Sequence, residues 1–150
     1  MKRSDALQPL SRDHHQALAV ALTLRRADAE TAPAAAGAFL EFWRSHGQAH
    51  FREEEEILLP AYAAHADAGH PLVVRVLIDH VEIRERAQRI ERGEPDAAPG
   101  ELNELGERLA EHVRIEEREL FPLIEAALPA DAAASLAAAL AHPEDDDAGG

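Results

Sequence analysis

Apolar side chains recur every three or four residues along most of the chain, which is the spacing expected for one face of an α-helix. The first such segment begins near Pro9, with Ser11 as its expected N-cap, and ends near Ala29. Its apolar stripe comprises Leu18, Leu22 and Leu24. The second segment covers about residues 33–59, because proline favours a first helical turn at its start and Pro60 ends or kinks it.

Two further long segments and a short one follow. The third opens at Pro71, and Gly93 is its expected C-cap. Its inward stripe comprises Val73, Val76, Leu77, His80, Ile83, Ala87 and Ile90. The fourth covers about residues 101–127, with Pro122 interrupting its last turns, and an alanine-rich fifth helix is expected over residues 131–142.

Four long helices with short connections predict an all-α fold, an up-down-up-down four-helix bundle with a short C-terminal fifth helix. Abundant alanine and scarce aromatic residues favour closely packed helices over a sheet. The length of 150 residues suits one domain, which we place at residues 1–142. Residues 143–150 are acidic and end in glycine, so we expect a disordered tail there.

The composition excludes several classes of function. The formal net charge is −14, which argues against nucleic acid and anionic membranes as partners because both are bound through basic patches. The chain contains no cysteine, so a transition metal would have to bind through histidine and carboxylate. The N-terminus has no apolar signal segment, and no apolar run approaches the ~20 residues of a membrane span. We therefore expect a cytoplasmic protein.

An internal repeat puts histidine and glutamate at one spacing on two of the helices. The segment HFREEEEILLP, which starts at His50, aligns without gaps with HVRIEERELFP, which starts at His112, and six of eleven positions are identical. Residues four apart share a helix face, so His50 and Glu54 can point at one spot. The same holds for His112 and Glu116. Imidazole binds iron, zinc, copper or nickel, and a carboxylate can bridge two cations, so these pairs supply half of a dinuclear site.

The other two long helices also bring histidine toward the interior. His80 follows Asp79 within an apolar stripe, and the first helix carries His14 and His15 after Asp13. At 100° per residue, the apolar stripe of the first helix lies about 30° from His14 and about 70° from His15, so we prefer His14. Buried imidazoles need partners, so four histidines and two glutamates in an apolar core predict a metal site.

Three more side chains are candidates for an extra ligand or for a group that supports a ligand: His15, His46 and Glu53. His46 lies one turn before His50 on the same face, so it is a candidate for an extra ligand, a donor that supports a ligand, or a gate for small molecules. We favour a supporting or solvent-facing role for it over ligation, and a surface or supporting role for His15.

In combination these motifs resemble the hemerythrin-like domains, also called HHE cation-binding domains. The resemblance covers about residues 7–128. It rests on Asp13-His14-His15, residues 50–55, Asp79-His80, residues 112–117, Leu59-Pro60 and Phe121-Pro122. It implies a left-handed four-helix bundle around two iron ions (Fe2+ or Fe3+) joined by an oxo or hydroxo bridge.

The resemblance also implies a ligand set. The six metal ligands would be His14, His50, Glu54, His80, His112 and Glu116. Glu54 and Glu116 would bridge the metals, with His14 and His50 completing one iron and His80 and His112 the other. Zinc or manganese would fit the same donors in place of iron.

One position departs from the family pattern. Oxygen-carrying members have a second histidine one turn after the ligand of the third helix, and this chain has Arg84 there. The chain is therefore similar to six-ligand members such as the bacterial iron-centre repair proteins. A missing ligand leaves an open or water-filled coordination position, which favours redox chemistry or sensing over simple oxygen carriage.

Three functions remain in competition. The chain would bind a small diatomic or peroxide ligand (O2, NO or peroxide) for sensing, scavenging or iron homeostasis. It would alternatively be a di-iron redox enzyme, peroxidase-like or NO-reducing. It would thirdly repair iron centres or handle iron, although repair proteins often carry a cysteine-containing extra domain, for which this chain has no room. We expect no nucleic-acid or membrane partner, and a monomer or a weak homo-oligomer.

Other metal-site classes lack their motifs. Ferritin-like di-iron proteins use Glu-x-x-His pairs. The positions three residues before the histidines of the second, third and fourth helices hold Gly47, Leu77 and Leu109. The His-Glu-x-x-His motif of zinc hydrolases is also absent. A metal-free structural bundle remains the alternative.

Overall fold

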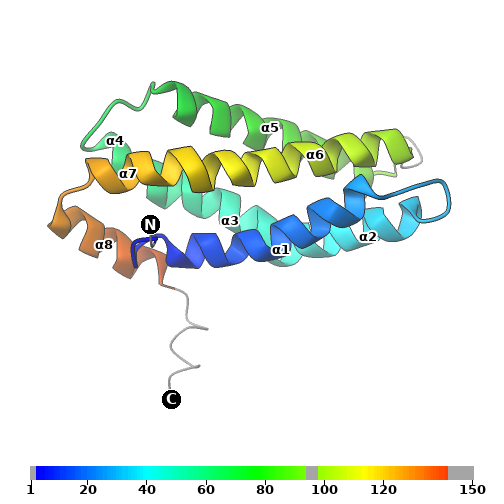
Figure 1. Cartoon of the computed structure of the whole chain (residues 1–150), viewed down its shortest axis with the longest axis horizontal. Coiled ribbons are helices and arrows are strands. Elements are labelled where there is room, and N and C mark those ends of the chain that lie inside the picture. Colours follow the sequence, from blue (N-terminus) through cyan, green and yellow to red (C-terminus); the bar gives the residue numbers. More distant parts are fainter. Residues whose placement is uncertain (1–2, 94–97, 142–150) are drawn as a thin grey trace, which may run out of the picture.

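The computed structural model describes residues 3–93 and 98–141, and every regular element within these residues is a helix (Figure 1). The helices form four long runs that pack together, and Figure 1 shows consecutive runs pointing in opposite directions. The predicted all-α bundle is confirmed. The arrangement is compatible with the predicted up-down-up-down order.

Four long runs and a short closing helix make up the described chain. The first run is α1 (Gln8–Arg25). The second run comprises α2 (Ala32–Phe42), the π-helical turn η1 (Trp43–Gly47), α3 (Gln48–Glu53), the π-helical turn η2 (Glu54–Leu58) and α4 (Leu59–Ala63). The third run is α5 (Pro71–Glu91). The fourth run comprises α6 (Pro99–Ile115), the π-helical turn η3 (Glu116–Leu120) and α7 (Phe121–Ala127), and α8 (Ala130–Leu140) follows it.

The start of α1 differs from the prediction. The N-cap position is Leu7, and no side chain caps it, so the expected capping role of Ser11 is wrong. Ser11 instead lies inside the helix, where its N–H donates to the carbonyl of Leu7. Pro9 explains the early start, because proline is favoured in the first turn, where its missing N–H has no helical partner to lose.

The end of α1 also comes earlier than the predicted Ala29. A turn replaces the last predicted residues, because the side chain of Asp28 accepts hydrogen bonds from the N–H groups of Glu30 and Thr31, at 2.9 Å each. Such a turn is a common alternative to further helix at aspartate.

The predicted short fifth helix is present as α8. Its Leu136 and Leu140 are buried in an apolar cluster with Leu58 and Ile124, so α8 covers one end of the bundle. The predicted helix end at residue 142 and the predicted tail at residues 143–150 lie outside the described residues.

Both repeat segments continue as helix through their proline. Of the two outcomes predicted for Pro60, an end or a kink of the second run, the end is therefore wrong. A π-helical turn precedes each proline. In η2 the N–H of Leu59 donates to the carbonyl of Glu54, five residues back, and in η3 the N–H of Phe121 donates to the carbonyl of Glu116. The wider turn changes the hydrogen-bond register just before a residue that has no N–H to donate. Single π-helical turns are frequent at functional sites.

Two apolar clusters fill the bundle, and the buried polar residues lie between them along every run. On α1, for example, Leu10 belongs to one cluster and Ala17 to the other, and His14 lies between. On α5, His80 lies between Val76 and Ile83 in the same way. The fold therefore surrounds a short polar layer with apolar packing on both sides.

The inner face of α1 differs in part from the predicted stripe. Leu18, Leu22 and Leu77 are 44, 43 and 39% exposed, so the prediction that they belong to the inward stripes is wrong. Between the buried Leu10 and Leu24, the inner face of α1 carries the small residues Ala17 and Ala21. Alanine there allows α1 to approach α6 closely. Despite the exposed leucines, no helix in the described part of the chain has the length and apolar character needed to cross a membrane.

We expect Gly106→Ala to destabilise the protein, because α1 and α6 meet at this glycine. A Cβ at Gly106 would lie 2.7 Å from the carbonyl oxygen of Ala21 and 2.9 Å from the backbone nitrogen of Arg25. The helices would have to separate, at a cost of about 1–3 kcal/mol in the free energy of unfolding, measured by urea denaturation.

Gly37→Ala is the matched control, since a Cβ at Gly37 in α2 meets no atom within 4 Å. It should stabilise the protein by roughly 0.5–1 kcal/mol through its helix propensity. Equal effects of the two substitutions would contradict the close contact between α1 and α6.

Candidate metal site

The six side chains predicted as metal ligands meet in the middle of the bundle, and each is at most 6% exposed. They form two overlapping groups, in each of which one potential ligand atom per residue lies within 4.8 Å of the others. One group is His14, His50, Glu54 and Glu116, and the other is Glu54, His80, His112 and Glu116. Two carboxylates are thus common to both groups, which is the arrangement that two bridged cations require.

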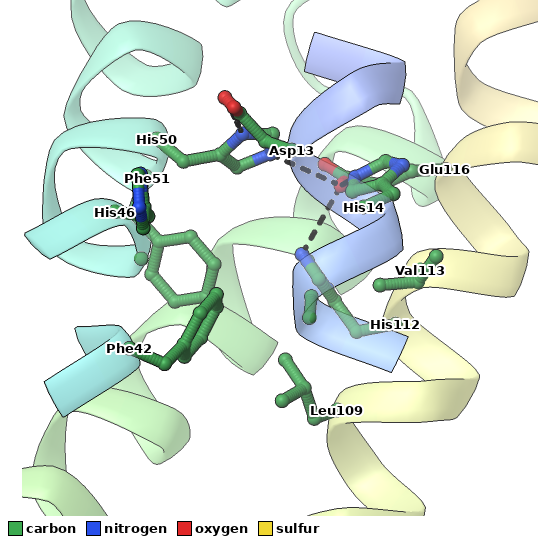
Figure 2. Close-up of a pocket in the computed structure, with 12 residues that line it drawn as sticks. Asp13, His14, Phe42, His46, His50, Phe51, Leu109, His112, Val113 and Glu116 are labelled. Carbon is green, nitrogen blue, oxygen red and sulfur yellow. Dashed lines mark hydrogen bonds and ion pairs between the residues drawn. The ribbon is translucent and has the colours of Figure 1, made fainter. Parts of the chain in front are cut away.

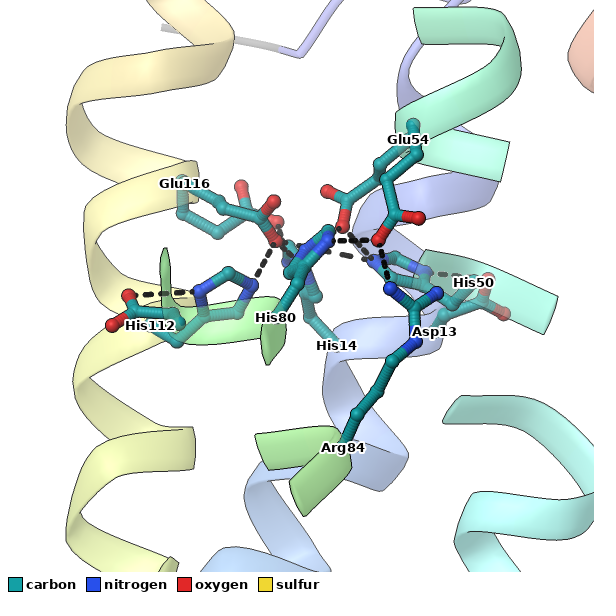
Figure 3. A network of polar contacts seen from close by, with 11 residues as sticks. Asp13, His14, His50, Glu54, His80, Arg84, His112 and Glu116 are labelled. Carbon is teal, nitrogen blue, oxygen red and sulfur yellow. Dashed lines mark hydrogen bonds and ion pairs between the residues drawn. The ribbon is translucent and has the colours of Figure 1, made fainter. Parts of the chain in front are cut away.

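The histidines turn the same ring nitrogen, Nε2, toward the shared carboxylates (Figure 3). The Nε2 of His14 lies 2.9 Å from Glu116 Oε1, and that of His80 lies 3.1 Å from Glu54 Oε1. His50 and His112 lie farther out, with Nε2 at 3.5 Å from Glu54 and 3.4 Å from Glu116, respectively. All four Nε2 atoms therefore surround one small volume.

The other ring nitrogen, Nδ1, of each of these histidines meets a carboxylate from a different helical run. The distances are 3.0 Å for His50 to Asp13, 2.6 Å for His80 to Glu55, 3.1 Å for His112 to Asp79 and 2.7 Å for His14 to Glu117. Each run thus supplies a carboxylate that contacts the histidine of the next run. Asp13 of run one contacts run two, and so on in order, until Glu117 of run four contacts His14 of run one. These four contacts form a closed ring, which we call the carboxylate ring.

The carboxylate ring fixes the chemistry of the histidines. When a neutral imidazole donates its Nδ1–H to a carboxylate, its Nε2 keeps a lone pair, and that lone pair can bind a metal in place of a proton. Each ring carboxylate is the sequence neighbour of a residue in the donor set, for example Asp13 of His14 and Glu117 of Glu116. A single turn of helix therefore carries an inward donor and a carboxylate that orients the donor of the next run.

Arginines lie outside the carboxylate ring. Arg3 lies 3.0 Å from Glu117, and Arg84 lies 2.6 Å from Glu55. Asp79 is contacted by Arg75 at 3.3 Å and by Arg108 at 3.7 Å. Arg84 therefore binds the carboxylate that holds His80. Its guanidinium also lies 5.7 Å from the centre of the Phe51 ring, which stacks on His80 at 3.8 Å.

These contacts shift the pKa values of three of the histidines and of Glu117. Burial lowers the pKa of His14, but hydrogen bonds to Glu116 and Glu117 outweigh burial and raise the pKa to about 9. Burial likewise opposes the charged forms of His50 and His80, yet their carboxylate partners raise both pKa values. Burial raises the pKa of Glu117, but its hydrogen bond with His14 is the main influence that lowers it to about 2.

The donor set fits a metal, because some of its buried atoms form no hydrogen bond. The Nε2 atoms of His50 and His112 and the Oε2 atoms of Glu54 and Glu116 are buried without a hydrogen bond. An unsatisfied buried polar group costs about 1–3 kcal/mol, so four of them at one point need an explanation. Cations between the two groups would satisfy all four atoms at once.

The structure separates the candidates for an extra ligand from the six. His15 is exposed, as is His46, and Glu53 is half-buried. None of these three belongs to a potential metal-binding group within the described residues. His14 is buried, as expected of a ligand, although Leu18 and Leu22 of the predicted stripe face solvent. Leu24, the third member of that stripe, is buried on the same side of α1 as His14.

Sequence reasoning missed the carboxylate ring. Asp13, Glu55, Asp79 and Glu117 were visible as acidic neighbours of the donors, but no role was assigned to them. The signal that could have found them is the pair of Asp-His dipeptides together with the repeated Glu-Glu dipeptide.

A small apolar pocket adjoins one side of the donor set (Figure 2). Its volume of about 20 Å³ exceeds the minimum of ~10–15 Å³ that a single water molecule needs. Its apolar lining comprises Ala17, Phe42, Gly47, Phe51, Leu109 and Val113. The donors that it touches are His14, His50, His112 and Glu116. A diatomic molecule could therefore lie directly beside the site.

The family model described as the hemerythrin HHE cation binding domain matches residues 5–124, which include the whole donor set and the carboxylate ring. No curated protein and no solved structure matches the chain significantly.

We expect the metal-free protein to lose stability as pH rises. The pKa of His14 is raised from 6.5 to about 9, so its protonated form stabilises the fold below pH 6.5, and this contribution is lost as pH rises through about 9. The raised pKa values of His50 and His80 act in the same direction. Urea denaturation with a chelator present, repeated across this pH interval, measures the effect.

Glu117→Gln should reduce this pH dependence, because it removes a carboxylate that favours protonated His14. Glu119→Gln, at an exposed position of the same turn, should leave it unchanged. A metal-free protein whose stability is constant or increases over the interval would contradict the assigned interactions.

Proposed function

We propose that this chain, which belongs to the hemerythrin HHE cation-binding domain family, holds two iron ions between its helical runs and binds a small ligand such as O2, NO or peroxide beside them. The observation that carries the proposal is the pair of buried groups that share Glu54 and Glu116. The buried atoms without hydrogen bonds support it further.

Each residue of the donor set has a distinct role in this proposal. His14 and His50 hold one iron, His80 and His112 hold the other, and the two shared glutamates lie between them. Bound iron would supply electron transfer and open coordination positions for small ligands. The carboxylate ring keeps every imidazole in the form whose Nε2 points inward, so the site is organised before a ligand arrives.

The two sides of the site differ, and this favours one side for ligand binding. The pocket touches both His14 and His50 but, of the other pair, only His112. Phe51, which also lines the pocket, stacks on His80 with its ring nearly parallel, and the Arg84 guanidinium lies near that Phe51 ring. A ligand would therefore enter beside the iron held by His14 and His50.

Arg84 supports a site with few protein ligands. Its guanidinium is bound to Glu55 at 2.6 Å. Arginine keeps its charge at all ordinary pH values, so it is a poor metal ligand. Positions left open on the metals are then available to small ligands, which favours sensing, scavenging or redox use over simple oxygen carriage.

Metal content tests the proposal. Protein purified anaerobically should contain two iron ions per chain, one for each group. Glu54→Ala and Glu116→Ala should each lose most of this iron, because each residue serves both groups. Elemental analysis measures the iron, and circular dichroism checks that the variants remain helical.

Glu56→Ala is the matched control, since Glu56 is an exposed neighbour in the same turn as Glu54. It should keep the full iron content. A folded wild-type protein without iron, or Glu54→Ala and Glu116→Ala variants that keep theirs, would rule out the proposed site.

Asp79→Asn tests the carboxylate ring separately from the donors. The carboxylate of Asp79 is 1% exposed and lies 3.1 Å from Nδ1 of His112. An amide of the same shape accepts a weaker hydrogen bond and can present an N–H instead, so His112 is no longer held with Nε2 available. We expect about 10–100-fold weaker iron binding, measured by competition with a chelator.

Glu85→Gln, at an exposed position of the same helix, controls for the loss of one negative charge. Its iron affinity should match that of the wild type. If Asp79→Asn binds iron as tightly as this control, the ring does not orient the ligands.

A further inference from the structure

One polar residue of the pocket has no part in the proposed metal site. The polar side chains that line the pocket are Asp13, His14, His46, His50, His112 and Glu116. Four of these are proposed ligands, and Asp13 belongs to the carboxylate ring through its contact with His50. His46 is the remaining one among the described residues that line the pocket.

His46 connects the pocket to solvent. It is exposed, yet it lines the same pocket as His50, which follows it by one helical turn and is buried. Figure 2 shows His46 with Phe42 and Phe51 on one side of the pocket, and Leu109 and Val113 on the other. An imidazole at this place can reach a molecule in the pocket from its open side.

The backbone next to His46 packs tightly against two aromatic rings. His46 lies in the π-helical turn η1, which ends at Gly47. A Cβ at Gly47 would lie 2.9 Å from ring atoms of both Phe42 and Trp43, so these two rings pack directly on the backbone beside His46. The rings form an apolar wall. His46, the only histidine of the described turn η1, lies next to this wall.

An apolar wall with one imidazole beside it would distinguish ligands by their charge. A neutral diatomic molecule fits an apolar pocket without further help, whereas an anionic ligand needs a hydrogen-bond donor for its outer atom. A neutral imidazole always has one N–H to donate, and a hydrogen bond to a charged acceptor is stronger than one to a neutral acceptor. We propose that His46 is a specificity-determining residue that donates a hydrogen bond to an anionic ligand in the pocket.

The proposal rests on the proposed function, because the ligand must bind beside the metal. Azide and nitric oxide are the probes, the first an anion and the second neutral. In the iron-loaded, oxidised protein, His46→Phe should weaken azide binding by about tenfold or more, as followed by visible absorption. In the reduced protein, the same substitution should change nitric oxide affinity by less than about twofold, since phenylalanine keeps the wall apolar.

Two further variants test whether the side chain of His46 donates a hydrogen bond or only fills space. His46→Gln keeps an N–H group, so it should retain most of the azide affinity that His46→Phe loses. His15→Phe replaces an exposed histidine outside the pocket lining and should leave both affinities unchanged.

The outcomes are distinct. Selective loss of azide binding in His46→Phe, with recovery in His46→Gln, supports the proposal. Unchanged azide binding in His46→Phe, with full iron content, overturns it and leaves the proposed function standing. An equal loss for both probes also overturns it, because it shows a steric effect of the side chain. A wild-type protein that contains iron but binds neither probe overturns the ligand-binding function and this proposal together.

Discussion

Four imidazoles and two carboxylates lie inside an apolar bundle, and the rest of the structure depends on how they are satisfied. Moving such groups out of water costs several kcal/mol for each charge unless other groups compensate. The chain compensates from outside the donor set, where the carboxylate ring holds every Nδ1 and arginines contact three of the ring carboxylates. It leaves four inner atoms without a hydrogen bond, and these are the atoms that cations would bind.

The ring follows from the repeat. Runs one and three each carry an Asp-His dipeptide, and runs two and four each carry the repeated segment with Glu-Glu. Packing the two halves against each other closes the ring, so each run both supplies a donor and orients the donor of another run. The approximate symmetry is broken outside the donor set. Phe51 stacks on His80 with Arg84 near its ring, whereas the pocket that Phe51 and His46 line touches His14, His50 and His112 but not His80.

Much of the site could be predicted because its residues recur at helical spacing. His50 with Glu54 and His112 with Glu116 share a face by geometry alone, and the structure brings them together. The carboxylate ring could not be predicted in the same way, because the contact of Asp79 with His112 depends on the register between two helices.

Other errors have similar physical causes. The continuation of helix through Pro60 depends on a π-helical turn that a regular period does not anticipate. The outward position of Leu18 and Leu22 follows from the close approach of α1 and α6, which selects alanine for the buried face. The pocket depends on Gly47, whose missing Cβ matters only when the rings of Phe42 and Trp43 are placed beside it.

The most direct test of the central claim is an anomalous X-ray diffraction map, recorded at the iron absorption edge from crystals of protein purified anaerobically. Two buried groups that share two carboxylates predict two iron peaks per chain. One peak should lie beside His14 and His50 and the other beside His80 and His112, with Glu54 and Glu116 reaching both. A map with no iron peak among these six side chains, or with a single peak outside them, would contradict the account.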